Sequence, residues 1–160
     1  MSTFEYSPIG VVHTPFTERE GMPIQPAGAK GVQGTIELFE EYHDGLKDLD
    51  GFSHLILIYH FHQSSGFKMQ VTPFMDSTLR GVFSTRAPSR PNPIGLSIVK
   101  LNRIEDGVLF VENLDLLDGT PLLDIKPYVP KFDQQTQVKT GWLEQTKSDI
   151  TQHKADDRFK

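Results

Sequence analysis

The sequence predicts a mostly β fold: a single small β-barrel domain with short helices and a loosely packed C-terminal tail. Short β-like runs recur along the chain between turn signals rich in Gly, Pro and Asp. No long amphipathic helices separate these runs, which disfavours a doubly wound parallel sheet. The 160 residues, 37% of them hydrophobic, suffice for one domain with a core but not for two ordinary domains.

The expected strands are runs of apolar and β-branched residues bounded by turn signals. They are Ile9–His13, Gly34–Phe39, His54–His62, Gly81–Thr85, Leu96–Arg103 and Val108–Leu114. Between the last two runs, Asp106 and Gly107 supply the positive φ angles of a tight hairpin turn. Two neighbouring antiparallel strands are therefore expected there.

Helices are expected to be short and few. One is predicted around Glu40–Leu49 and a second, from a thinner apolar pattern, within Val138–His153. We therefore assign residues 1–130 to the barrel domain and residues 131–160 to a C-terminal tail with helical character.

The run from His54 to His62 alternates strictly, so its side chains fall on two faces. One face carries Leu55, Leu57, Tyr59 and Phe61; the other carries His54, Ile56, Ile58, His60 and His62. One face should enter the core. His60 and His62 would then lie side by side at a spacing that could hold a metal ion, although no third ligand is apparent and a structural histidine is the commoner case.

Composition and charge exclude several classes of protein. The absence of cysteine excludes a disulfide scaffold, a thiolate zinc site, an iron–sulfur cluster and a cysteine nucleophile. No stretch approaches the roughly 20 apolar residues of a membrane span, and the N-terminus lacks signal-peptide features, so a cytoplasmic protein is expected. The net charge of −5 argues mildly against nucleic acid, yet Lys68–Arg103 holds six basic residues and one acid. That segment is either a basic face for an anionic ligand or ordinary mixed surface.

The segment from Arg86 to Gly95 is the densest in features that suit a binding site. Three prolines within six residues forbid a helix and make the chain stiff and extended. Two arginines on a stiff loop lose little entropy on binding a carboxylate or phosphate. A rigid connector with solvated arginines is the alternative, and we favour the binding role.

Three aspartates interrupt the apolar stretch that ends at Tyr128. They are Asp115, Asp118 and Asp124. A carboxylate among leucines either caps backbone donors or serves a ligand, because an unpaired buried charge is costly. For each one alone, capping is the more common explanation. Sequence motifs of P-loops, dinucleotide-binding folds, serine hydrolases and zinc proteases are absent.

Taken together, these segments resemble the TrmO family, also called YaeB- or TsaA-like. The matching pieces are Ile9-Gly10, Gly51-Phe52-Ser53-His54-Leu55, Phe61-His62-Gln63, Thr85-Arg86, Arg90-Pro91-Asn92-Pro93-Ile94-Gly95 and Leu116–Tyr128. The resemblance covers roughly Ser7 to Pro130. It implies a β-barrel, non-Rossmann methyltransferase that uses S-adenosyl-L-methionine and acts as a homodimer, and we assign no metal-binding residues. Its tRNA-modifying members methylate N6 of the threonylcarbamoyladenosine beside the anticodon.

Carried over position by position, the resemblance implies a set of cofactor-binding residues. The set is Gln25, Pro26, Ala27, Gly28, His62, Gln63, Arg86, Leu96, Glu112, Asn113, Leu114 and Asp115. An arginine suits the cofactor carboxylate, and an apolar slot beside Leu96 and Leu114 would suit its adenine. Asp118, Asp124 and Tyr128 are the candidate general bases. Arg80, Arg90 and Arg103 are the candidate contacts to tRNA.

Two other functions remain open from the sequence. One is a regulatory module that binds S-adenosylmethionine without methylating RNA. The other is a small-molecule enzyme that uses His60 and His62 with a metal ion.

Overall fold

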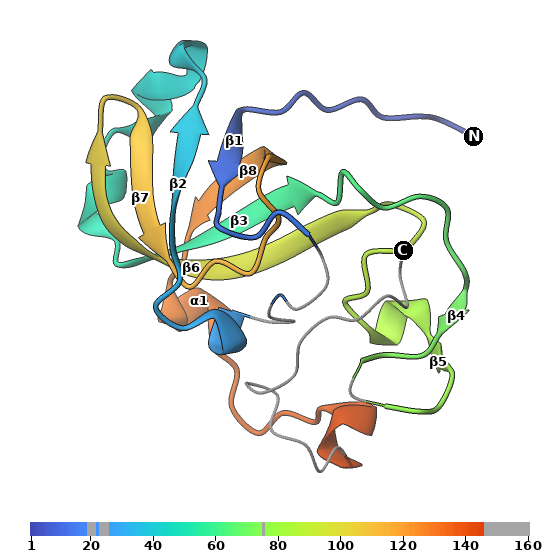
Figure 1. Ribbon diagram of the computed structural model, residues 1–160. Coiled ribbons are helices and arrows are strands. Elements are labelled where there is room, and N and C mark those ends of the chain that lie inside the picture. The colour runs from blue at the N-terminus through green and yellow to red at the C-terminus, as the bar shows by residue number, and fades with distance from the viewer. Residues whose placement is uncertain (19–21, 23–25, 75, 146–160) are drawn as a thin grey trace.

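The computed structural model describes residues 1–18, 22, 26–74 and 76–145 (Figure 1). Six antiparallel strands form a closed barrel in the order β1-β2-β7-β6-β3-β8, with β8 pairing back onto β1. The strands are β1 (Gly10–His13), β2 (Gln33–Leu38), β3 (His54–His60), β6 (Ile94–Glu105), β7 (Val108–Glu112) and β8 (Thr120–Pro127). The mostly β fold class is confirmed.

The barrel interior is filled by alternate residues of every strand. The buried core residues are Val12, Ile36, Leu55, Leu57, Tyr59, Val99, Leu101, Leu109, Val111, Leu114, Leu116 and Leu122. In β3 the Leu-Tyr face points inward, as the alternation allowed. In β6 the inward positions include Gly95 and Ser97, and the outward positions hold Ile94, Leu96 and Ile98. The outer wall of β6 is therefore more apolar than part of its inner wall.

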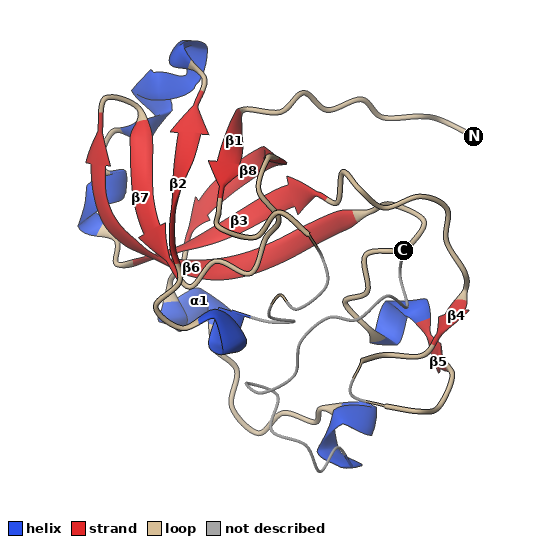
Figure 2. Cartoon of the chain, in the orientation of Figure 1, coloured by secondary structure: helices blue, strands red, loops and turns tan. Residues whose placement is uncertain are grey.

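A smaller lobe lies beside the barrel (Figure 2). It contains the two-stranded sheet of β4 (Gln70–Val71) and β5 (Arg80–Gly81), followed by the 3-10 helix η4 (Val82–Ser84). Val71, Val82 and Ala87 form its own small core, with Phe74 packed against it. From the tail, the Trp142 indole N–H donates to the Ser84 carbonyl at 2.9 Å.

The short helices are mostly 3-10 rather than α. They are η1 (Pro26–Ala29), η2 (Glu40–Leu46), η3 (Leu49–Gly51) and η5 (Gly141–Gln145), and the one α-helical turn among the described residues is α1 (Pro130–Asp133). The helix expected over Glu40–Leu49 is therefore two 3-10 helices. That expected within Val138–His153 overlaps η5, and its remainder lies outside the described residues. None of the described helices has the length and apolar character needed to cross a bilayer.

Two strand predictions need correction. The strand expected at Gly81–Thr85 is wrong beyond its first residue, because the chain turns into η4, where Thr85 Oγ1 donates to the Val82 carbonyl at 2.7 Å. The strand β8 was not predicted, because proline and aspartate are uncommon in strands and this one contains Pro121, Asp124 and Pro127. The hairpin at Asp106-Gly107 is confirmed, with φ angles of 50° and 77°.

Candidate functional site

One end of the barrel gathers most of the residues expected to bind the cofactor. At this end β3 and β7 finish and β2 and β6 begin, because neighbouring strands are antiparallel. The turn carrying His62 and Gln63 follows β3, and the segment Asn113–Asp115 follows β7. The loop of Arg86 leads into β6. Three segments that are far apart in the sequence thus meet at one mouth of the barrel.

The helix η1 joins this end through a backbone contact to the segment after β7. The Gly31 N–H donates to Asn113 Oδ1 at 2.9 Å, and the Asn113 N–H donates to the Val32 carbonyl at 2.9 Å. Asn113 has a φ of 70°, which an asparagine tolerates better than most side chains. These bonds join Asn113 to the turn that follows η1, the helix that contains Pro26, Ala27 and Gly28. Gln25 lies outside the described residues.

The proline-rich loop is held rigid from both sides. The Arg90 guanidinium donates through Nη1 to the carbonyls of Thr85 at 2.9 Å and Ala87 at 3.2 Å. The Phe61 N–H donates to the Pro93 carbonyl at 2.8 Å, and Ser64 Oγ donates to the Pro88 carbonyl at 3.1 Å. Arg90 therefore braces the loop from within, and the side chain of Arg86 is exposed.

A chain of three polar side chains lies at the inner wall of this end. Tyr59 Oη lies 2.8 Å from Ser97 Oγ, which in turn donates to Asp115 Oδ1 at 2.7 Å. Tyr59 and Ser97 are 5% and 1% exposed. Burial raises the pKa of Asp115 to about 6, although the Ser97 hydrogen bond and the Arg86 charge oppose the rise. Burial, followed by the charge of Asp115, raises the pKa of Tyr59.

Gly95 makes room for the aromatic side chains beside this chain. A Cβ there would lie 2.6 Å from Cζ of Tyr59 and 2.8 Å from Cζ of Phe61, too close for any real side chain. The two rings meet edge to face with centroids 5.4 Å apart. The glycine thus lets the Tyr59 ring approach β6 closely, with its hydroxyl at Ser97.

Leu96 and Leu114 do not line one slot. Leu114 is fully buried in the barrel core, and Leu96 is 45% exposed on the outer face of β6. An adenine pocket bounded by both side chains is therefore wrong, because they lie on opposite faces of the wall. Leu96 remains a candidate contact only for a ligand or partner on the outer side.

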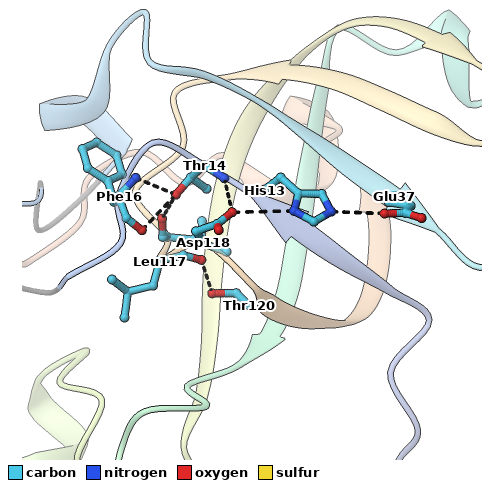
Figure 3. Close-up of polar contacts among 8 residues, drawn as sticks. His13, Thr14, Phe16, Glu37, Leu117, Asp118 and Thr120 are labelled. Carbon is cyan, nitrogen blue, oxygen red and sulfur yellow. Dashed lines mark hydrogen bonds and ion pairs between the residues drawn. The ribbon is translucent and has the colours of Figure 1, made fainter.

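The Asp118 carboxylate accepts a hydrogen bond from the backbone, as Figure 3 shows. Its Oδ1 accepts the Thr14 N–H at 3.0 Å and lies 3.6 Å from Nδ1 of His13. The other ring nitrogen of His13 lies 3.2 Å from a carboxylate oxygen of Glu37. The adjoining turn is closed by Thr120 Oγ1, which donates to the Leu117 carbonyl at 2.6 Å. Asp118 lies at the same barrel end as Asp115, with its carboxylate used for capping.

The other two candidate bases lie elsewhere. Asp124 accepts the Ile125 N–H at 2.9 Å and pairs with Lys126 at 2.8 Å beside the β-bulge of β8. Tyr128 lies at the opposite end of β3, where its ring meets His54. Tyr128 is therefore far from the cofactor end, and Asp124 lies opposite Ile58 with its carboxylate already paired to Lys126.

The three arginines considered for tRNA are separated. Arg80 pairs with Asp76 at 2.6 Å and lies 5.6 Å from the Trp142 ring centroid. Arg103, near the far end of β6, stacks 3.7 Å above the Phe110 ring and pairs with Glu105 at 3.1 Å. With Arg90 inside its loop, the three do not form one patch.

The histidine pair is divided between two elements. His60 ends β3, and His62 lies in the turn that follows. Within the described ranges, no three His, Asp or Glu side chains are arranged to hold a metal ion.

The sequence analysis missed Tyr59 and Ser97 as site residues. Tyr59 was placed only on a strand face, and Ser97 was read as part of an apolar run. A serine at an inward position of a core strand is a signal, because a buried hydroxyl needs a partner. The signal was hidden because Ile94, Leu96 and Ile98 make the outer face of β6 resemble a core face.

Comparison with known proteins extends these observations. The chain is 50% identical over 154 residues to a protein of Pyrococcus abyssi named "Probable S-adenosyl-L-methionine-binding protein", covering 96% of this chain and 84% of that one. It is 39% identical over 140 residues to the tRNA (adenine(37)-N6)-methyltransferase of Escherichia coli, covering 81% of this chain and 60% of that enzyme. The crystal structure of TrmO from Pseudomonas aeruginosa superposes with a TM-score of 0.74 at 41% identity, covering 88% of this chain and 62% of that chain.

The chain thus spans less than two thirds of the length of that enzyme and of that crystal structure. The family model described as the tRNA-methyltransferase O N-terminal domain matches residues 11–134, which include all six barrel strands except the first residue of β1. On this match and these identities, the protein belongs to the TrmO N-terminal domain family.

Proposed function

We propose that this protein is an S-adenosylmethionine-dependent methyltransferase acting on N6 of the threonylcarbamoyladenosine beside the anticodon of a tRNA. The observation that carries the proposal is the convergence of the expected cofactor segments on one barrel end, around Arg86 and Asp115. The name of the Escherichia coli relative supports the reaction, and that of the Pyrococcus abyssi relative supports the cofactor.

The charges at this barrel end fit the cofactor. Arg86 is exposed and its charge acts on Asp115, so a cation and an anion lie close together at the mouth. S-adenosylmethionine itself carries a carboxylate, an ammonium group and a sulfonium that activates its methyl group for transfer. Arg86 suits the cofactor carboxylate through charge-assisted hydrogen bonds. The Asp115 carboxylate suits a position near the positively charged ammonium or sulfonium group. The backbone around Asn113 is fixed by hydrogen bonds before any ligand arrives.

We also propose that the protein acts as a homodimer. The outer faces of β3 and β6 form a continuous apolar surface, which we call the outer apolar face: Ile56, Ile58, Ile94, Leu96 and Ile98. Ile56 is registered opposite Ile98, and Ile58 opposite Leu96. A monomer rarely leaves such a face in water. A second copy of the chain would cover this face, including Leu96. Leu96 directly precedes Ser97, whose side chain is on the inner wall.

The alternative is a module that binds S-adenosylmethionine without methylating RNA. It is favoured by the name of the Pyrococcus abyssi relative, which mentions binding of S-adenosyl-L-methionine and no methyl transfer. In this case the same barrel end would bind the cofactor as a signal.

One experiment separates these functions. The protein is incubated with methyl-labelled S-adenosylmethionine and tRNA from a strain lacking the gene, and the tRNA is digested to nucleosides. Label in the N6-methylated threonylcarbamoyladenosine is the expected result. Calorimetric binding of S-adenosylmethionine without label in any nucleoside would instead support the binding module. Absence of both would overturn both functions.

A further inference from the structure

Methyl transfer to an N–H nitrogen leaves a proton to be disposed of. The N6 nitrogen of threonylcarbamoyladenosine is amide-like and is a poor nucleophile while it keeps that proton. A base that removes the proton as the new bond forms would lower the barrier, and positioned bases of this kind typically contribute about 10²–10⁴-fold. The question is which described residue at the cofactor end can do so.

The acidic groups at this end differ in how their oxygens are used. Asp118 accepts a backbone N–H and faces His13. Glu112 accepts the side-chain amide of Asn102 at 3.0 Å. Asp115 differs from these acids because its Oδ1 accepts a hydrogen bond from a buried hydroxyl, that of Ser97, in addition to a backbone hydrogen bond.

The hydrogen bonds behind Asp115 run in one direction. Ser97 has a single hydroxyl proton, which it donates to Asp115 Oδ1. The hydrogen bond between Tyr59 and Ser97 must then use the tyrosine proton. Both hydroxyls therefore point toward the carboxylate and favour its ionised, proton-accepting form. No polar side-chain atom buried among the described residues lacks a partner, so the arrangement is complete as it stands.

The surroundings also keep Asp115 basic. Burial acts against the charged form, and the Ser97 hydrogen bond and the Arg86 charge act in its favour. Tyr59 faces it through Ser97 and stays protonated. The balance leaves the carboxylate ionised at neutral pH and more basic than a solvated aspartate.

We propose that Asp115 accepts the N6 proton during methyl transfer, with Ser97 and Tyr59 as positioning residues; the inference rests on the proposed function. The N6 nitrogen forms a bond to the methyl carbon, and the bond between that carbon and sulfur breaks with its electron pair remaining on sulfur. The N6–H proton passes to the Asp115 carboxylate. Sulfonium and carboxylate become thioether and carboxylic acid, so charge and atoms balance.

The main test is the single-turnover methylation rate at saturating S-adenosylmethionine and tRNA for Asp115→Asn. The expected result is a 10²–10³-fold loss that extra cofactor does not restore. A loss abolished by saturating cofactor would make Asp115 a cofactor ligand alone and overturn the inference. Asp106→Asn is the matched control, because Asp106 is an exposed acid in the turn at the other end of β6 and asparagine accepts its positive φ. It should keep the wild-type rate.

The second test separates a positioning role from a merely structural one. The wild-type rate should fall below about pH 6, where Asp115 binds its proton. Ser97→Ala removes a hydrogen bond that favours the ionised form, so this fall should move to higher pH. The Asp115 carboxyl titration, followed by NMR without substrate, should move by the same amount. A titration that shifts while the rate profile does not would overturn the inference.

The same assays distinguish failure of the Asp115 role from failure of the proposed methyltransferase function. If the wild-type protein methylates tRNA and Asp115→Asn matches its rate and pH profile, only the role of Asp115 is refuted. If the wild-type protein transfers no methyl group, the proposed function fails and the role of Asp115 fails with it.

Discussion

The carboxyl group of Asp115 couples the candidate site to the stability of the fold. Its pKa is about 6 in the folded protein against 3.8 for an unperturbed aspartate, chiefly because of burial. Between these values the folded state holds a proton that the unfolded chain has lost. The free energy of unfolding should therefore fall as pH rises from about 4 to about 6, and stay low above that range. Below about pH 4 both states are protonated and the group contributes nothing.

Asp115→Asn should remove this pH dependence. The integrated effect is at most roughly 3 kcal/mol, since each unit of pKa corresponds to about 1.4 kcal/mol. The variant should therefore unfold at a higher urea concentration than wild type at pH 8 and at a similar one at pH 4. Urea titrations at both pH values check this. Parallel pH profiles for the two proteins would contradict burial as the cause of the raised pKa.

Arg86 should matter more than Arg90 to cofactor affinity. The positive charge of Arg86 acts on Asp115, at the barrel end that gathers the cofactor segments. The guanidinium of Arg90 donates to two carbonyls of its own loop and so holds that loop in shape. Arg86→Ala should weaken S-adenosylmethionine binding about 10- to 100-fold, from the loss of roughly 1.5–3 kcal/mol. Arg90→Ala should give a smaller loss of affinity together with a lower melting temperature.

Calorimetric titration of both variants measures the difference. Arg103→Ala is the control for affinity, because Arg103 lies near the other end of β6 over Phe110. Equal and small losses for Arg86 and Arg90 would remove Arg86 from the binding site.

Among the elements, the strands with one apolar face were the ones that the sequence predicted well. β3 was located almost to the residue because its inward leucines alternate with other side chains. β8 was missed because its proline and aspartate residues mimic a loop, although it pairs with strands on both sides. Only the three-dimensional pairing shows that Asp124 lies outward opposite Ile58. Likewise, the inner-wall role of Ser97 depends on the facing of β6, which composition alone could not decide.

Gly95→Ala tests the packing that places Tyr59. The added Cβ would collide with the rings of Tyr59 and Phe61, so one ring must move. We expect a destabilisation of about 1–3 kcal/mol and a displaced tyrosine hydroxyl. Thermal unfolding and the near-ultraviolet circular dichroism of the aromatic side chains measure the two effects.

Gly81→Ala is the matched control for that variant. A Cβ at Gly81 meets nothing within 4 Å, and its φ of −60° suits any residue. Equal stabilities for the two variants would show that the Tyr59 ring can leave β6 without cost.

The two faces of β6 contrast: the inner face is partly polar, and the outer face belongs to the outer apolar face. We expect Ile98→Glu to disrupt the proposed dimer, because a buried unpaired carboxylate opposes association. Sedimentation at micromolar concentration should give about twice 18.1 kDa for wild type and about 18.1 kDa for the variant. Leu79→Glu, which replaces an exposed apolar residue of the smaller lobe, should stay dimeric. A wild-type monomer would refute the homodimer.

The position of β8 has a consequence for how the protein is made. β8 is the last barrel strand to be synthesised, yet it lies between β1 and β3 and closes the ring. Until Thr120–Pro127 has left the ribosome, β1 and β3 can each present a row of unpaired backbone donors and acceptors. The pairing of β1 with β8 joins residues far apart in the sequence, which raises the contact order and slows folding. A nascent chain stalled before Thr120 should therefore be protease-sensitive and prone to pair with other strands, and ring closure becomes the step that a chaperone would protect.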